Sequence, residues 1–593
     1  MEQGDIVLEV KNLSVSFDGR TVVDNVSYAL RRGRTLGIVG ESGSGKSVST
    51  LAIMGLLPKN ATVSGKIELR TGNGELRTEN GELRTENGER RTESGERETE
   101  SIDLLKLDEK QMQGLRGGRI AMIFQEPMTS LNPVQKCGAQ VVEMLRLHEE
   151  VDYDEARRRT IELFKEVLLP RPEKIFDSYP HEISGGQKQR VMIAMALICK
   201  PDVIIADEPT TALDVTVQKT ILELLRDLQR SRDIAVIFIT HDLGVIAQVA
   251  DDIAVMYHGK IVEQGDANDI LHRPQHPYTQ GLLACRPPLD GRPRHLPTVE
   301  EFLKAESGKR KAESEGWRAE SGERKAESGE PLLSVRNLDV TYALEKSIFG
   351  KPLKQLKAVD GISFDVYRGE TLGLVGESGC GKTTLGRAIL GLVDSASGSI
   401  SFDGQRLDGL TASQMRKIRP RIQIIFQDPY SSLNPRMTVG QTISEPLRVH
   451  KRNGRLSQSE IRGKVVDLME RVGLDAGWID RYPHEFSGGQ RQRICIARAL
   501  ILNPDLVICD ESVSALDVSV QAQVLNLLNE LKEHFGYTYI FISHDLSVVH
   551  FISDRIMVMQ SGRMVELNDA DVLFRNPSSD YTRSLLDAIP RIV

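Results

Sequence analysis

Short, almost continuously apolar runs recur at matching places in the two halves of the chain. They lie at 120–125, 203–208 and 236–241 in the first half, and at 422–427, 506–511 and 539–544 in the second. Such runs are expected for strands of a parallel sheet that is covered on both faces. Each half opens on a longer strand of alternating apolar residues, at 6–17 and 332–342. The pattern predicts an α/β core with a helical insertion in each half.

Two motifs occur twice, which indicates that the halves are homologous copies of one unit. VGESGSGKS at 39–47 recurs as VGESGCGKT at 375–383, and YPHEISGGQKQR at 179–190 recurs as YPHEFSGGQRQR at 482–493. From the second motif onward, matched positions lie 303 residues apart. The first motif does not keep this offset, so the first half carries an insert between its two motifs.

The insert at 72–101 consists of the heptad GELRTEN and its decaying copies. Each heptad offers at most one apolar residue, which excludes a coiled-coil seam and favours a disordered loop. A second biased stretch at 304–330 repeats Lys/Arg-Ala-Glu-Ser-Gly and indicates a flexible linker. We therefore expect a first domain at 1–290 that contains the insert, a flexible charged linker at 291–330 and a second domain at 331–593.

Composition narrows the class of protein. The chain has 593 residues and a net charge of −8, which gives no general electrostatic reason to bind nucleic acid. Its six cysteines form no C-x-x-C pair, so a reducing compartment without disulfides or a zinc knuckle fits best. No stretch approaches the roughly 18 apolar residues of a membrane span, and the first residues do not resemble a Sec-type signal.

Both glycine motifs satisfy G-x-x-x-x-G-K-[ST], the phosphate-binding loop between a buried strand and a helix. In such a loop, backbone N–H groups surround the phosphates of a nucleotide, the lysine reaches the β- and γ-oxygens, and the hydroxyl binds Mg²⁺. The predicted loop residues are Gly40, Ser42, Gly43, Ser44, Gly45, Lys46 and Ser47 in the first half, and Gly376, Ser378, Gly379, Cys380, Gly381, Lys382 and Thr383 in the second.

An Asp-Glu pair ends a buried strand downstream of each glycine loop. Carboxylates at the carboxyl end of a strand lie beside the phosphate loop in sheets of this kind. We predict that Asp207 and Asp510 hold Mg²⁺. Glu208 and Glu511 are the predicted general bases, which polarise the water that attacks the γ-phosphate.

At this point the chain resembles the ATP-binding cassette ATPases. The sequence Ser-Gly-Gly-Gln is their signature, and it is formed here by Ser184, Gly185, Gly186 and Gln187 and by Ser487, Gly488, Gly489 and Gln490. The resemblance implies an α/β fold with two tandem P-loop ATP-binding cassette domains, each with a mostly parallel sheet core, an antiparallel β edge and a helical insertion. It also implies that the two halves pair head to tail and sandwich two ATP molecules between phosphate loops and signatures.

Other positions match the family one by one. Gln125 and Gln427 resemble the loop glutamines that touch Mg²⁺, His241 and His544 the switch histidines that sense the γ-phosphate, and Asp214 and Asp517 the loops that cross the dimer interface. Phe17 and Tyr342 stand where the family stacks an aromatic ring on adenine, although simple core packing remains the alternative. Nothing required for hydrolysis is lost in either half, so the resemblance implies two competent sites with ATP and Mg²⁺ as cofactors.

Three further segments are similar to the peptide and nickel importer branch, in its fused twin-cassette form. They are the loops at 126–133 and 428–435, the Tyr-Pro-His-Glu sequences before each signature, and His-Pro-Tyr-Thr at 276–279. This resemblance implies an ATPase subunit that energises import of a small peptide-like solute. It also implies two integral-membrane permease subunits and an extracytoplasmic solute-binding protein as partners, with the chain peripheral at the cytoplasmic face of the bacterial inner membrane.

The alternative is a soluble twin-cassette ATPase that acts on ribosomes or nucleic acid. Such a protein should carry a long, basic, helical arm able to reach RNA. The linker at 304–330 mixes charge signs and is rich in glycine. The importer interpretation is therefore favoured.

Overall fold

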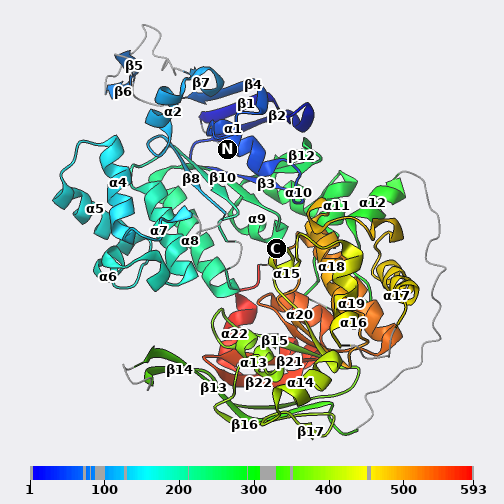
Figure 1. Cartoon of the computed structure of the whole chain (residues 1–593). Coiled ribbons are helices and arrows are strands. Elements are labelled where there is room, and N and C mark those ends of the chain that lie inside the picture. The colour runs from blue at the N-terminus through cyan, green and yellow to red at the C-terminus, as the bar shows by residue number, and fades with distance from the viewer. Residues whose placement is uncertain are drawn as a thin grey trace. The chain divides into compact units, whose positions relative to one another are not determined.

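The computed structural model describes residues 5–70, 75–79, 82–86, 101–125, 130–210, 213–289, 291–306, 329–346, 352–450 and 456–590 (Figure 1). Contacts divide the chain into two compact units. The first consists of 1–213, 217–283 and 590–593, and the second of 214–216 and 284–589. Among the described helices, none has both the length and the apolar character needed to cross a membrane.

The first cassette is built around two main sheets. The larger has the strand order β12-β11-β3-β10-β9-β8, parallel except for the edge strand β12. The smaller is antiparallel, in the order β2-β1-β4-β7. The strands are β1 (Ile6–Phe17), β2 (Arg20–Arg31), β3 (Thr35–Val39), β4 (Ala61–Arg70), β7 (Ser101–Asp103), β8 (Ile120–Ile123), β9 (Val203–Asp207), β10 (Ala235–Thr240), β11 (Asp252–Tyr257) and β12 (Lys260–Asp266).

Helices join the strands of this cassette and pack on the sheets or on one another. They are α1 (Lys46–Ile53), α2 (Glu109–Leu115), α4 (Cys137–His148), α5 (Tyr153–Glu166), α6 (Pro172–Asp177), α7 (Gly185–Leu197), α8 (Val215–Arg232), α9 (Leu243–Val249), α10 (Ala267–His272) and α11 (Pro277–Ala284). Helices α4, α5 and α6 pack on one another, and α4 and α5 also contact α7 (Figure 1). They form the predicted helical insertion.

The second cassette repeats this architecture. Its larger sheet has the order β18-β19-β20-β15-β21-β22, with β22 antiparallel, and its smaller sheet the order β14-β13-β16-β17. The strands are β13 (Leu333–Lys346), β14 (Pro352–Val366), β15 (Thr371–Val375), β16 (Ser397–Phe402), β17 (Gln405–Arg406), β18 (Ile422–Ile425), β19 (Leu506–Asp510), β20 (Thr538–Ile542), β21 (Arg555–Gln560) and β22 (Arg563–Asp569). The predicted fold class is confirmed.

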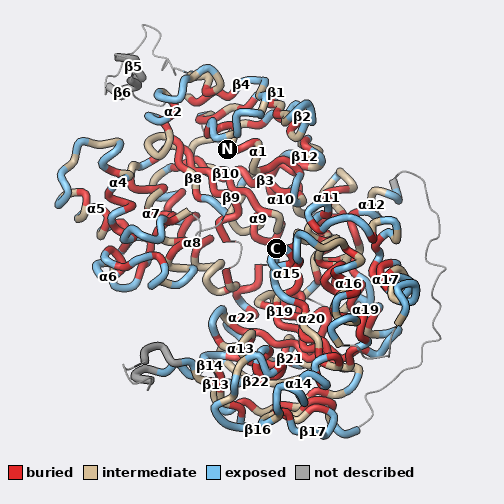
Figure 2. The backbone as a smooth tube through the Cα atoms, viewed as in Figure 1, coloured by how far each residue is buried: buried red, intermediate tan, exposed pale blue. Residues whose placement is uncertain are grey.

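The helices of the second cassette follow the same plan. They are α13 (Lys382–Ile389), α14 (Ala412–Ile418), α15 (Pro429–Ser432), α16 (Val439–His450), α17 (Gln458–Arg471), α18 (Gly488–Leu500), α19 (Val518–Phe535), α20 (Leu546–Ile552), α21 (Ala570–Arg575) and α22 (Asp580–Asp587). In the first cassette, β3, β9 and β10 are buried along their whole length (Figure 2). Because the catalytic loops begin where these strands end, a rigid core positions them.

The repeat insert was predicted to be a disordered loop. Within it the structure describes two antiparallel strands, β5 (Glu75–Glu79) and β6 (Glu82–Glu86), and β7 begins at its last residue. The rest of the insert lies outside the described residues. The sequence between β5 and β6 is Asn-Gly, the preferred two-residue connection of a hairpin. This signal favours a hairpin where composition favours a loop.

The predicted linker at 291–330 begins with an ordered stretch. Helix α12 (Val299–Glu306) lies within it, and contacts assign the chain from Ala284 onward to the second unit. Leu296 is fully buried, and its N–H and C=O both bond to the side chain of Asn526, at 2.9 and 2.8 Å. The side chains of Leu296 and Val299 are buried and those of Phe302 and Leu303 half-buried, which explains why residues 291–306 pack against the second cassette instead of forming linker.

We expect Asn526→Ala to release the segment 291–306 from α19. The change leaves two buried backbone groups of Leu296 without their partner, which costs on the order of 2 kcal/mol. Local opening should therefore become more frequent, and tryptic cleavage after the exposed Arg294 should be at least about tenfold faster. The matched control is Glu223→Ala, at the equivalent exposed position of α8. Equal cleavage rates in the two variants would contradict the assigned role of Asn526.

Candidate functional site

Each phosphate loop joins a buried strand to a helix. In the first cassette β3 ends at Val39 and α1 begins at Lys46. The N-cap residue Gly45 has a φ of 99° and makes no side-chain cap, so the helix N-terminus is not closed by a capping side chain. A side chain could not replace the hydrogen at Gly40, because a Cβ there would lie 2.2 Å from the carbonyl oxygen of Met256. These constraints shape the loop for an anion at a helix N-terminus.

The second loop has the same geometry. Gly381 caps α13 with a φ of 104° and no side-chain bond. A Cβ on Gly376 would lie 2.2 Å from the carbonyl oxygen of Met559. The repetition of these close approaches indicates that both loops hold one conformation.

The loop lysines are buried and point back over the loop. Nζ of Lys46 donates to the carbonyl oxygens of Gly40 and Glu41 at 2.7 and 2.8 Å. In the second cassette, Nζ of Lys382 donates to Gly376 and Glu377 at 2.7 and 3.0 Å. Each ammonium group is thus fixed among backbone oxygens that phosphate oxygens of a nucleotide can replace.

A hydroxyl and a carboxylate meet beside each loop. The Ser47 hydroxyl donates to Asp207 at 3.1 Å, and the Thr383 hydroxyl donates to Asp510 at 2.9 Å. Burial raises the pKa of Asp207 to about 6 and also raises the pKa of Asp510. Oxygen donors of this kind suit Mg²⁺, and a divalent cation would compensate the buried negative charge. These four predicted metal residues therefore fit the ion chemically.

Two predicted catalytic residues, Glu208 and His241, and the predicted metal residue Gln125 come together in the first cassette. Glu208 accepts a hydrogen bond from Nε2 of Gln125 at 2.9 Å, and its other carboxylate oxygen lies 3.2 Å from Nδ1 of His241. Its backbone adopts a φ of 46°, a left-handed conformation that is rare for a residue other than glycine and is often found at active sites. Gln125 thus contacts the predicted base through its amide nitrogen, and the predicted contact of Gln125 and Gln427 with Mg²⁺ stays a prediction.

The second cassette repeats this cluster. Glu511 has a φ of 48° and accepts from Nε2 of Gln427 at 2.7 Å, while His544 lies 3.7 Å away. Burial alone would raise the pKa of Glu511, but the adjacent, positively charged His544 lowers it. Burial would lower the pKa of His544 and of His241, but the adjacent glutamate raises each. In both cassettes the adjacent glutamate thus favours the protonated form of the histidine.

The signature serines begin long helices. Ser184 accepts from the N–H of Gln187 at 3.4 Å, and the Gln187 side chain accepts from the N–H of Ser184 at 3.0 Å. Ser487 and Gln490 form the same reciprocal capping box at 3.4 and 3.1 Å. Each serine is exposed, so a helix N-terminus faces solvent with its positive end accessible to an anion.

The remaining predicted residues lie apart from these clusters. Phe17 is half-buried and packs against the first core, whereas Tyr342 is 38% exposed. Asp517 caps α19 by accepting from Val520 at 3.0 Å, and Asp214 accepts from the Thr216 hydroxyl at 2.7 Å. Their roles at adenine and at a dimer interface stay predictions.

One contact was missed by the sequence analysis. The phenol oxygens of Tyr278 and Tyr581 accept hydrogen bonds from the phosphate-loop N–H groups of Glu41 and Glu377. The only signal in the sequence is the offset of 303 residues shared by the two tyrosines. It indicates equivalence but no contact.

Each cassette is thus a P-loop nucleotide-binding domain, and comparison with known proteins specifies the family. The model of the ABC transporter family matches residues 23–211 and 359–514. The model of the oligopeptide/dipeptide transporter C-terminal region matches 262–310 and 565–593. The second match in each case confirms that both halves carry the same modules.

Curated relatives match almost the whole chain. The glutathione import ATP-binding protein GsiA of Pectobacterium atrosepticum is 47% identical over 590 residues, which cover 98% of this chain and 89% of the relative. The protein of the same name from Salmonella choleraesuis is 48% identical over 592 residues, again covering 98% and 89%. Among solved structures, cbiO1 from Clostridium perfringens is 29% identical over 42% of this chain and 92% of its own, with a TM-score of 0.37.

The chain belongs to the ABC transporter family, as a fused twin-cassette ATP-binding protein of its oligopeptide and dipeptide branch. It binds ATP and hydrolyses it, as the ATPases of this family do.

Proposed function

We propose that the chain is the ATPase subunit that energises import of a small peptide-like solute, with glutathione as the first candidate. The proposal rests on similarity along the full chain to glutathione import ATP-binding proteins. It is also supported by an intact catalytic cluster in each cassette. Selectivity for the solute belongs to the partners, which are two membrane-embedded permeases and an extracytoplasmic solute-binding protein. The chain would lie at the cytoplasmic face of the inner membrane.

Bound Mg²⁺ would neutralise charge on the β- and γ-phosphates. Ser47 and Asp207, and Thr383 and Asp510, are the proposed ligands. Within each cassette the lysine would exchange its carbonyl partners for phosphate oxygens, and the glutamate would accept a proton from the attacking water. The histidine paired with that glutamate would keep the carboxylate ionised and oriented.

We further propose that the two halves pair head to tail, with each signature helix facing the phosphate loop of the other half. The exposed N-termini at Ser184 and Ser487 suit a γ-phosphate, because a helix N-terminus attracts an anion. ATP would then hold the halves together, and hydrolysis would release them. Transport is in this view a population shift between closed and open dimers.

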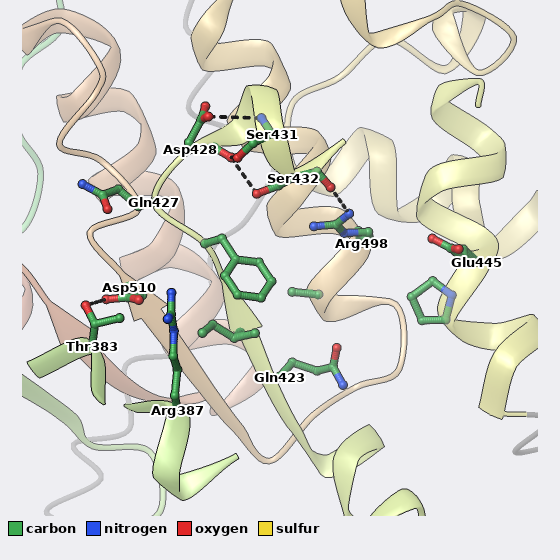
Figure 3. A pocket seen from close by; sticks show the side chains of 14 residues that line it. Thr383, Arg387, Gln423, Gln427, Asp428, Ser431, Ser432, Glu445, Arg498 and Asp510 are labelled. Atoms are coloured by element: carbon green, nitrogen blue, oxygen red, sulfur yellow. Dashed lines mark hydrogen bonds between the residues drawn. The ribbon is translucent and has the colours of Figure 1, made fainter. Parts of the chain in front are cut away.

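A groove in the second cassette suits a permease helix. Its volume is about 680 Å³, and it runs from the phosphate-loop helix to the helical insertion (Figure 3). Phe426 in its wall is 37% exposed, and Arg498 donates to the carbonyl oxygen of Ser432, the last residue of α15, at 2.6 Å. Gln427 lines the groove and also bonds Glu511. A partner seated here could therefore act on the catalytic glutamate through one side chain.

Affinity purification of the tagged chain from detergent-solubilised membranes of its host, followed by mass spectrometry, tests the proposal. Two multi-span permeases should accompany the chain, and the complex in vesicles should take up glutathione only with ATP. The variant that lacks both catalytic glutamates is the matched control for uptake. Ribosomal proteins without a permease would overturn the import proposal and favour the soluble alternative.

A further inference from the structure

The C-terminal extension of each cassette is the region matched to the oligopeptide/dipeptide transporter C-terminal model, residues 262–310 and 565–593. One helix of each extension, α11 or α22, contacts the phosphate loop of its own cassette. The N–H of Glu41 donates to the phenol oxygen of Tyr278 in α11 at 3.0 Å. The N–H of Glu377 donates to that of Tyr581 in α22 at 3.3 Å. Tyr278 is fully buried, with its ring 4.2 Å from the ring of Tyr257. Neither tyrosine belongs to the phosphate-loop motif.

A carboxylate anchors the turn before each of these helices. Glu263 in β12 accepts from the N–H groups of Gln275 and His276 at 2.7 and 3.1 Å. Glu566 in β22 accepts from Ser578 and Ser579 at 2.9 and 3.2 Å. Burial would raise the pKa of Glu566, but these hydrogen bonds lower it, so the anchor is charged at neutral pH.

The two cassettes complete the turn with different side chains. Nδ1 of His276 accepts from the N–H of Tyr278 at 3.1 Å, whereas the hydroxyl of Ser579 accepts from the N–H of Tyr581 at 3.2 Å. The residue differs, but the geometry that orients the tyrosine is the same. Both halves therefore share one feature, a phenol oxygen that accepts a hydrogen bond from the phosphate loop.

The backbone of Glu41 and that of Glu377 are each held at two points, at the N–H and at the carbonyl oxygen. Their N–H groups bond to the tyrosines, and their carbonyl oxygens bond to Lys46 and Lys382. If the glutamate backbone moved, its carbonyl oxygen, which accepts a hydrogen bond from the loop lysine, would move as well. The lysine that is expected to contact the phosphates would then lose its position. The tyrosine and the lysine thus act on one backbone unit.

We propose that Tyr278 and Tyr581 are positioning residues of the two ATP sites, which hold the phosphate loop and its lysine ready for nucleotide. The C-terminal extension of each cassette then contributes a positioning residue to the ATP site. The inference rests on the proposed phosphate-binding role of the loops.

The test is the double variant Tyr278→Phe with Tyr581→Phe in the full chain. Both rings remain, and one neutral hydrogen bond is lost at each site, which corresponds to about three- to tenfold in affinity. Titration with a fluorescent ATP analogue and Mg²⁺ should show this loss, and KM for ATP should rise while kcat of basal hydrolysis changes less than twofold. Unchanged affinity and KM would overturn the proposal, as would a fall in kcat alone.

Tyr539→Phe is the matched control. This hydroxyl is buried in β20 and has no hydrogen-bond partner in the described part of the chain, so its removal should leave ATP affinity unchanged. An equal loss in the control would also overturn the proposal. Should the double variant fold poorly, Tyr581→Phe alone gives the comparison, because Tyr581 is only half-buried. Binding needs no permease or solute, so failure of the import proposal leaves this test valid.

Discussion

ATP hydrolysis should fall by about 10³-fold when Glu208 and Glu511 are both replaced by glutamine, while ATP stays bound. A positioned general base contributes roughly 10²- to 10⁴-fold to a proton transfer. Glutamine keeps the size of the side chain and an oxygen that can accept from Gln125 or Gln427, but it cannot take a proton from water. The loss should therefore appear in kcat and not in nucleotide affinity.

The backbone conformation and the partners of Glu208 and Glu511 support this role. Both glutamates have a left-handed backbone conformation that costs on the order of 1 kcal/mol. Each lies between an amide donor and a histidine. A residue that merely ended a strand would need neither the strained backbone nor two partners on its carboxylate. We expect the double variant to accumulate ATP and to hold the proposed closed pairing of the halves.

Phosphate release and retained radiolabelled ATP measure the two effects on one preparation. The matched control is Glu182→Gln with Glu485→Gln, because these glutamates accept from the N–H of Tyr179 and Tyr482 in local capping boxes. Glutamine can make the same bond, so hydrolysis should be unchanged. Normal turnover in Glu208→Gln with Glu511→Gln would refute the assignment of the general base.

Much of the site could be predicted because its parts are local in sequence. The glycine loops, the Asp-Glu pairs and the signature serines each lie within a few residues of a strand end or a helix start. Strand order could not be predicted in the same way, since apolar runs carry no information about which neighbour they pair with. The contact between Gln125 and Glu208, 83 residues apart, depends on β8 and β9 being adjacent. Family resemblance supplied what the pattern could not.

The contacts made by the C-terminal extensions and by the segment 291–306 could not be predicted from the sequence for a related reason. The bond from Glu41 to Tyr278 spans 237 residues, and an equal offset in both halves indicates homology only. Residues around Leu296 look like linker by composition, because one buried leucine and a short helix are a weak signal beside a charged repeat. The partner of Leu296 is Asn526, a polar residue within a helix. Sequence alone gives no reason to expect its side chain to bond the backbone of a distant segment.

Asp207→Asn should stabilise the nucleotide-free protein at pH 7.5 while it abolishes Mg²⁺-dependent hydrolysis. Burial raises the pKa of Asp207 from 3.8 to about 6. Between these values the folded chain binds more protons than the unfolded chain, so stability falls as pH rises through this window and stays lower above it. The ionised carboxylate then costs the folded state about 3 kcal/mol. Asparagine removes that cost and can still accept from Ser47.

The same substitution should impair catalysis. A neutral amide is a poor ligand for a divalent cation, so the charge of the phosphates would not be compensated. Thermal unfolding without nucleotide should show a midpoint several degrees higher for Asp207→Asn at pH 7.5, and the gain should shrink at pH 5. Added Mg²⁺ and ATP should stabilise the unaltered protein much more than the variant. Asp154→Asn, an exposed carboxylate in the first turn of α5, is the control and should show no such gain. If the unfolding midpoint of Asp207→Asn does not rise, or if the rise does not depend on pH, the ionised carboxylate of Asp207 does not destabilise the nucleotide-free protein. The proposed role of Asp207 as a buried cation ligand would then be wrong.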